Sequence, residues 1–156
     1  WLSSDDIYAP TKLFENLNLF VTIPDCGIIW GDYYHIDEND NIISFFRTED
    51  GADFKKTKMY SNSTNGISVL FKKEVIKKAG YFDENIGGKT GHCADGLMWH
   101  KILYYYNYGI LHNPLVYTRV HSQQLGQNIS NQFKLKAWEE YREYMKEWLQ
   151  HNGFGE

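Results

Sequence analysis

A few polar side chains in this sequence are of the types that bind metal ions, phosphates or protons. Asp5 and Asp6 stand side by side after an apolar start, Asp95 follows a glycine-containing stretch, and Arg119 and His121 lie two residues apart near the end of an apolar run. Adjacent carboxylates repel each other, so such a pair needs a cation, a helix end or water. Carboxylates with an imidazole suit Mn²⁺ or Mg²⁺, the ions that a diphosphate leaving group requires.

The elements that must position the first carboxylates are a strand and a helix. Trp1 and Leu2 have the character of the last residues of a buried strand, and Pro10 suits the first turn of a helix. The helix is predicted to bury one apolar face, because apolar residues recur at helical spacing. That face consists of Leu13, Phe14, Leu17, Phe20 and Val21.

The middle of the chain is predicted to form a hairpin, a strand and a short helix. Two runs rich in Ile, Tyr and Phe flank a polar turn at 38–41, which favours a hairpin over residues 27–47. Residues 67–71 are predicted to form a short buried strand. The helix that follows is predicted to end at Gly80.

The remaining candidate residues are predicted to lie at a helix start and on a late strand. Asp95 precedes an apolar helical face, so it falls in or just before the first turn. Residues 114–121 are predicted to be a strand in which Arg119 and His121 project to the same side. The last predicted helix spans residues 131–150, with an apolar stripe. The stripe consists of Leu135, Trp138, Tyr141, Met145 and Trp148.

Composition excludes several classes of protein. The 156 residues are 42% hydrophobic and 17% aromatic, which is typical of one folded domain. The net charge of -4 argues against binding to nucleic acid. Cys26 and Cys93 are too few for a disulfide framework, and we expect free thiols. No run is long enough to cross a bilayer as a helix.

Four segments, in order, resemble glycosyltransferase family 2. "WLSSDDIYAPTKL" resembles the segment around that family's DxD-type motif, and "GISVLFKKEVIKKAGYFDENIGG" is similar to its next strand and helix. "ADGLMWHKI" resembles the E-D-x-x-x-W helix, and "YTRVHSQQ" resembles the closing Y-R-x-H segment. Together they cover residues 1 to about 125.

The resemblance implies a fold, a reaction and a role for each residue. The fold would be GT-A, an α/β sandwich with a mainly parallel sheet, which binds a nucleotide-sugar and Mn²⁺ or Mg²⁺. Asp5 would reach the metal and the diphosphate, with Asp6 beside it and His121 as a further metal ligand. Arg119 would contact phosphate or a carboxylate. Asp95 would be the general base of an inverting sugar transfer.

The resemblance also implies partners and a location. The donor would be a nucleotide-sugar, most commonly a UDP-sugar, and the acceptor a glycan or a lipid-linked glycan of bacterial surface polysaccharide. The protein would be cytoplasmic, and its acceptor or other proteins would bring it peripherally to the inner face of the membrane. Residues 1–130 would form the C-terminal, acceptor-side part of the domain, without the nucleotide-binding half, and 131–156 a helix packed on it.

Two departures from the family pattern support competing hypotheses. Ser3 stands where many relatives have an acidic residue, and Ala94 replaces the Glu of the Glu-Asp pair. A non-catalytic carbohydrate-binding or scaffold domain is therefore the main alternative, and a metal-dependent phosphohydrolase is a third.

Each candidate residue also has a purely structural interpretation. Asp5 with Asp6, and Asp95, would then cap helices. Arg119 would be an ion-pair partner and His121 a structural side chain. A zinc site at His92 and Cys93 is disfavoured, because the sequence contains no second pair of ligands.

Overall fold

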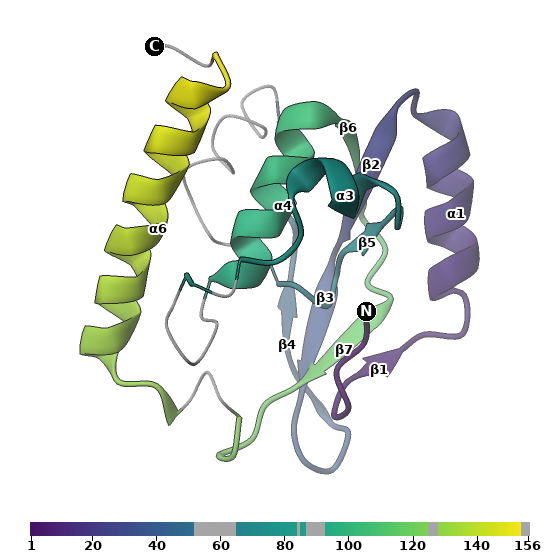
Figure 1. The fold of residues 1–156 in the computed structure, drawn as a ribbon. Coiled ribbons are helices and arrows are strands. Elements are labelled where there is room, and N and C mark those ends of the chain that lie inside the picture. Colours follow the sequence, from purple (N-terminus) through teal and green to yellow (C-terminus); the bar gives the residue numbers. More distant parts are fainter. Residues whose placement is uncertain (52–64, 84, 87–92, 125–127, 154–156) are drawn as a thin grey trace.

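The protein has a mixed α/β fold. The computed structural model describes residues 1–51, 65–83, 85–86, 93–124 and 128–153. These residues form four helices and seven strands (Figure 1). In chain order the elements are β1 (Ile7–Tyr8), α1 (Lys12–Thr22), β2 (Cys26–Gly31), β3 (Tyr33–Ile36), β4 (Ile42–Phe46), β5 (Leu70–Phe71), α3 (Val75–Ala79), α4 (Ala94–Tyr105), β6 (Asn107–Leu111), β7 (Val116–Arg119) and α6 (Asn131–His151). The α/β class predicted from the sequence is confirmed, and the GT-A arrangement stays a prediction.

The strands form two mixed sheets. One has the order β1-β7-β3-β4, and the other has the order β5-β2-β6. Only the β3–β7 and β2–β6 pairings are parallel among the described strands, and the other three pairings are antiparallel. The expectation of a mainly parallel sheet is therefore wrong for this part of the chain, because β1, β4 and β5 all run antiparallel to their neighbours.

The core is built around β2, whose six residues are all buried. Ile28 and Trp30 pack on one side against α3 and α4, and Ile29 packs on the other side with Phe20 of α1. The three-stranded sheet thus has helices on both faces (Figure 1). A strand covered on both faces must be apolar throughout, which explains the continuous run Gly27-Ile28-Ile29-Trp30.

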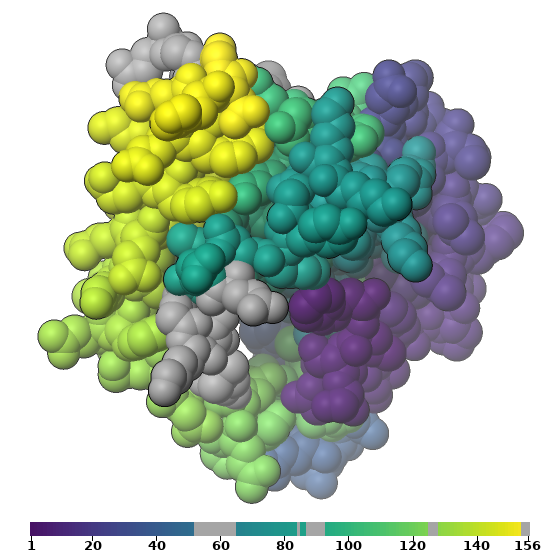
Figure 2. All heavy atoms as spheres, viewed as in Figure 1, coloured from purple at the N-terminus to yellow at the C-terminus, as the bar shows by residue number. Residues whose placement is uncertain are grey.

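Helix α6 packs against α4 as an outer layer. Ala137, Tyr141, Met145 and Leu149 of α6 form a cluster with Leu97 of α4 and other residues. Leu135, which the sequence pattern placed in the buried stripe, is 66% exposed. Leu135 lies in the first turns of α6, outside the cluster with α4. Figure 2 shows α6, in yellow and yellow-green, along one edge of the molecule.

Helix α1 buries a different face from the one predicted. Lys12, Asn16 and Phe20 are buried, whereas four of the five predicted core residues are exposed. The exposed residues are Leu13, Phe14, Leu17 and Val21. Only Phe20 belongs to both sets. The buried polar residues satisfy each other and the backbone: the Lys12 Nζ donates to Asn16 Oδ1 at 3.3 Å and to the Ser68 carbonyl at 2.9 Å.

The hairpin is shorter than predicted, and the chain start is not a strand. β3 and β4 form the hairpin, and 27–31 belongs to β2 in the other sheet. Trp1 and Leu2 lie outside any strand; the Trp1 ring contacts the Phe82 ring, with 5.2 Å between centroids. Figure 2 shows these first residues, in dark purple, beside the teal segment that includes Phe82.

Further predictions concerned the end of α3 and the two cysteines. α3 ends at Gly80, whose φ of 86° is the left-handed conformation that favours glycine at a helix end, so this prediction is confirmed. Cys26 and Cys93 are buried and form no disulfide with each other. Within the described part of the chain, no helix is both long enough and apolar enough to cross a bilayer.

Candidate functional site

The pairing of β1 with β7 brings Asp5 and Asp6, here called the acidic turn, to the end of strand β7. Ile7 is opposite Tyr117 and Tyr8 is opposite Val116 in this antiparallel pair. Continuing the same register places Asp5 opposite Arg119, although 114 residues separate them in the sequence. Two of the candidate segments therefore meet although they lie far apart in the sequence.

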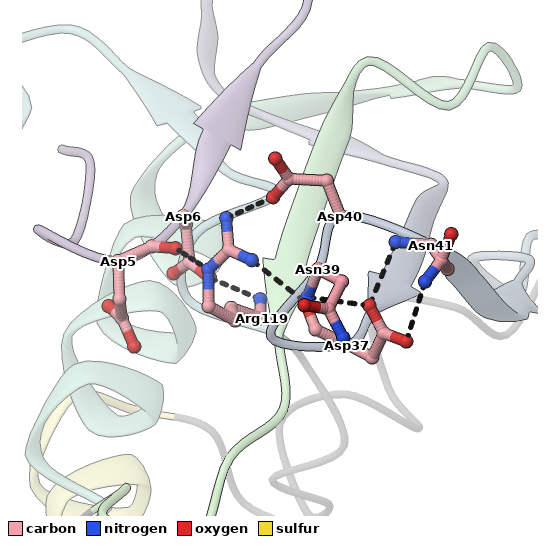
Figure 3. A network of polar contacts seen from close by, with 7 residues as sticks. All are labelled: Asp5, Asp6, Asp37, Asn39, Asp40, Asn41 and Arg119. Atoms are coloured by element: carbon pink, nitrogen blue, oxygen red, sulfur yellow. Dashed lines mark hydrogen bonds and ion pairs between the residues drawn. The ribbon is translucent and has the colours of Figure 1, made fainter.

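Arg119 is the centre of a hydrogen-bond network. Its backbone N–H donates to Asp6 Oδ1 at 2.7 Å, and its side-chain Nε donates to the Asp5 carbonyl at 2.9 Å. Nη1 donates to the Asp37 carbonyl at 2.7 Å, and Nη2 forms an ion pair with Asp40 at 2.6 Å. Figure 3 shows this arrangement. All three guanidinium nitrogens thus bind protein oxygens, as in the structural interpretation of Arg119.

Asp37 and Asp40 belong to the β3–β4 turn, which is itself ordered by side-chain hydrogen bonds. The Asp37 carboxylate accepts from the backbone N–H groups of Asn39 and Asn41 at 2.8 and 2.9 Å, and from the Asn41 side chain at 2.9 Å. This is the local bonding by which Asp and Asn stabilise turns. Sequence reasoning identified the turn but not its contact with Arg119, which depends on the β3–β7 pairing.

Asp5 and His121, the two predicted metal ligands, contact each other. His121 Nε2 lies 3.0 Å from Asp5 Oδ2, and the side chains are 22% and 34% exposed. The hydrogen bond from His121 holds the pKa of Asp5 below its ordinary value, although partial burial acts in the opposite direction. A carboxylate that is partly open to solvent and stays ionised is suited to bind a cation.

Asp6 has the opposite electrostatic environment. Burial raises the pKa of Asp6, and the neighbouring charge of Asp5 acts in the same direction. The hydrogen bond from the Arg119 backbone N–H lowers the pKa of Asp6 and partly offsets this rise. The two adjacent carboxylates are thereby distinguished: Asp5 faces His121 and solvent, whereas Asp6 fixes the backbone of β7.

Asp95 lies in the first turn of α4, as predicted from the sequence. Its Oδ1 accepts a hydrogen bond from the Gly96 backbone N–H at 2.7 Å, so one carboxylate oxygen is held by the helix start. The other oxygen, Oδ2, faces Gly66: a Cβ at that position would lie only 2.7 Å from Oδ2 and 3.7 Å from Trp99 Nε1. Gly66 is needed here for space.

Sequence reasoning missed the importance of Gly66, although it lies at the start of a quoted motif. Its signal in the sequence is the small residue directly before the apolar run 67–71. The buried indole N–H of Trp99 has no hydrogen-bond partner within the described part of the chain. The Trp99 ring packs against the rings of Phe71 and Phe82.

Among the described residues, Asp95 makes no hydrogen bond or ion pair with Asp5, Asp6, Arg119 or His121. A short turn, residues 65–68, connects the two regions. The Tyr8 hydroxyl donates to the Ile67 carbonyl at 3.2 Å, and the Asn65 side chain donates to Thr118 Oγ1 at 3.0 Å. The residues on either side of Gly66 are therefore attached to β7 and β1, while Gly66 itself lies against Asp95.

The donor set at Asp5 and His121 fits a metal ion only with help from a ligand. No group of three or more His, Cys, Asp or Glu side chains in the described ranges is arranged to hold a metal ion. Mg²⁺ in proteins is commonly held by one or two carboxylates together with water and substrate phosphates. Asp5 supplies one such carboxylate with the His121 imidazole beside it, and diphosphate oxygens would have to complete the coordination. His92, one of the two residues considered for zinc, lies outside the described residues.

Comparison with known proteins identifies distant relatives. No protein-family model matches the chain. It is 26% identical, over 86% of its own length, to an uncharacterized glycosyltransferase of Rickettsia typhi. It is 28% and 27% identical, over 84% of its length, to uncharacterized glycosyltransferases of Rickettsia felis and Rickettsia conorii.

The chain spans 43% of the R. typhi protein and 22% of each of the other two. These similarities support a relationship to glycosyltransferases.

Proposed function

We propose that this chain is the acceptor-side part of a metal-dependent, inverting glycosyltransferase of family 2 with a GT-A fold. It would transfer a sugar from a nucleotide-sugar, most commonly a UDP-sugar, to a glycan or lipid-linked acceptor of bacterial surface polysaccharide. The observation that carries the proposal is the contact between Asp5 and His121, which joins the first and last motifs of the resemblance. The glycosyltransferase names of the distant relatives support the same conclusion.

In this proposal Asp5 and His121 hold Mn²⁺ or Mg²⁺ together with the diphosphate. The ion, when bound, offsets the negative charge that grows on the departing diphosphate. Asp6 and Arg119 position Asp5, because each binds the backbone on the opposite side of the β1–β7 pair. We therefore propose that Arg119 positions the acidic turn rather than binding phosphate directly.

Asp95 is the proposed general base. The N-terminal end of α4 favours a negative charge, and the Gly96 N–H holds one oxygen in place. The other oxygen accepts the proton of the acceptor hydroxyl as that hydroxyl oxygen forms a bond to the anomeric carbon. The bond from the anomeric carbon to the diphosphate oxygen breaks at the same time, so the configuration at that carbon inverts.

Release of nucleoside diphosphate by the full-length product of the gene tests this proposal. A panel of nucleotide-sugars and glycan acceptors is assayed with Mn²⁺ and with a chelator. We expect metal-dependent release, a loss of about 10²–10⁴-fold in Asp95→Asn, and a comparable loss in Asp5→Asn. Asp25→Asn is the matched control, because Asp25 is exposed and its φ of 52° is tolerated by Asn. Full activity in both active-site variants would refute the proposal.

A non-catalytic carbohydrate-binding or scaffold domain is the second candidate. It is favoured by Ser3 and Ala94, which replace acidic residues of the family pattern, and by the full engagement of Arg119 with protein oxygens. This candidate predicts sugar binding that is unaffected by a chelator and by both aspartate substitutions.

A further inference from the structure

A cavity of about 680 Å³ lies next to the acidic turn, between the β3–β4 turn and the segment that follows β7. Its volume is within the range of about 300–1,000 Å³ that small-molecule sites span. Its described lining residues are Asp37, Glu38, Asn39, Val120, His121, Ser122 and Asn128.

The position of this cavity follows from contacts already described. One wall is His121, whose imidazole binds Asp5. The opposite wall is the β3–β4 turn, which Arg119 holds in place through the Asp37 carbonyl and the Asp40 carboxylate (Figure 3). A ligand in the cavity would therefore contact the same His121 that borders the proposed metal and diphosphate site.

The lining offers hydrogen-bonding groups that the protein does not use itself. The Glu38 carboxylate, the Asn39 side-chain amide and the Ser122 hydroxyl form no hydrogen bond with another residue in the ranges described. Asn128 donates through Nδ2 to the carbonyls of Ser122 and Gln124, which leaves its amide oxygen as an acceptor. Carboxylate, amide and hydroxyl groups together match the alternating donors and acceptors of a sugar's hydroxyls.

The charge around the cavity disfavours an anionic ligand. Asp37 and Glu38 both line it, and Arg119 directs its guanidinium nitrogens to Asp5, Asp37 and Asp40. Phosphate recognition normally depends on a guanidinium or ammonium group that is free to bind it. A phosphate or a carboxylate on the ligand would instead meet like charges here.

We propose that this cavity binds one sugar ring of the acceptor, and that this ring carries neither a phosphate nor a carboxylate. The inference rests on the proposed transferase function and deepens it, because it names the chemical class of the acceptor unit beside the site. The turn residues Glu38 and Asn39 and the residues Ser122 and Asn128 recognise its hydroxyls.

Direct binding measured by NMR tests the proposal without relying on turnover. The probes are methyl glucoside, methyl galactoside and methyl N-acetylglucosaminide, each added to the isotope-labelled chain in the presence of a chelator. We expect the largest shifts at the side-chain amides of Asn39 and Asn128. Asn128→Leu should weaken binding about tenfold, since a hydrogen bond is lost and a hydroxyl is left without a partner. Asn18→Leu, the same change on exposed α1, should leave binding unchanged.

The selectivity against anions is tested with glucose 6-phosphate and glucuronate. We expect both to bind at least about tenfold more weakly than methyl glucoside. Glu38→Lys should reduce that discrimination, because it replaces a repelling charge by an attracting one. Equal affinity for neutral and anionic sugars, or shifts located away from the cavity in every case, would overturn the inference.

The outcomes separate this inference from the proposed function. Metal-dependent diphosphate release without any binding of neutral sugars at the cavity would overturn the inference and leave the transferase proposal intact. Neutral sugar binding at Asn39 and Asn128 in a protein that never releases diphosphate would support the cavity as a sugar site, and would leave the binding-domain alternative in place of the transferase.

Discussion

Lys12 provides a quantitative test of the α1 packing. Its side chain is 1% exposed, and its Nζ binds Asn16 Oδ1 and the Ser68 carbonyl. Burial lowers the pKa of Lys12 from 10.5 to about 8. No carboxylate pairs with its ammonium group in the part of the chain that the structure describes. The folded protein therefore bears a cost for burying a charge at neutral pH.

The sign and size of the effect follow from proton linkage. Between pH 8 and pH 10.5 the unfolded chain holds the Lys12 proton more tightly than the folded chain does, so the free energy of unfolding rises with pH. A pKa difference of about 2.5 units corresponds to about 3 kcal/mol at full effect. Between pH 7 and pH 10 the Lys12 contribution should become more favourable by about 2–3 kcal/mol.

The Lys12→Met variant isolates this contribution. Methionine has nearly the same length as lysine but no charge. The free energy of unfolding of the variant should therefore lack the rise with pH that Lys12 causes. In this variant the Ser68 carbonyl and Asn16 Oδ1 lose their donor at every pH. The informative quantity is therefore how the difference in free energy of unfolding between wild type and variant changes with pH.

Urea unfolding, monitored by the fluorescence of the 5 tryptophans, measures both proteins at pH 7 and pH 10. Lys146→Met, at an exposed position of α6, is the matched control and should show no such change. If the difference between wild type and Lys12→Met varies by less than about 0.5 kcal/mol over this range, the ammonium is not buried as the structure places it.

Three further predictions concern α1, Arg119 and Gly66. Leu17→Ser, on the exposed face of α1, should change the free energy of unfolding by less than about 0.5 kcal/mol. Phe20→Ala on the buried face should cost about 3–5 kcal/mol in the same urea titration. Arg119→Lys should destabilise by about 1–2 kcal/mol, because an ammonium cannot reach Asp5, Asp37 and Asp40 together; wild-type stability would contradict the network. Gly66→Ala should lower kcat for sugar transfer at least about tenfold with an unchanged circular dichroism spectrum, since its Cβ would displace Asp95; an unchanged kcat would show that Asp95 Oδ2 is not needed where it lies.

Local signals in the sequence predicted the elements whose ends are determined locally. α3 ends at Gly80 because a left-handed residue is required there, and Asp95 falls in the first turn of α4 because a helix start favours an acidic residue. The β3–β4 hairpin was also predicted, since the bonds of Asp37 to Asn39 and Asn41 are local.

Features that depend on distant segments could not be predicted from the pattern. The apolar residues of α1 indicated a helix but not which face is buried. The buried Lys12 donates to the carbonyl of Ser68, which lies 56 residues away in the sequence. β2 was assigned to the hairpin because nothing local shows that it pairs with β6. The grouping of Asp5 with His121 came from the family resemblance, whereas the contact of Arg119 with the hairpin turn required the β3–β7 pairing.

The Arg119 network makes the hairpin a remote determinant of the acidic turn. An insertion or deletion between Asp37 and Asp40 would move two of the four oxygens that Arg119 binds, and the Asp5 carbonyl would shift with it. A change in the length of this turn would therefore alter the geometry of Asp5 and His121 while leaving every acidic residue of the first motif unchanged. Loop exchange between relatives, with the two strands kept, is a direct way to vary the site without mutating it.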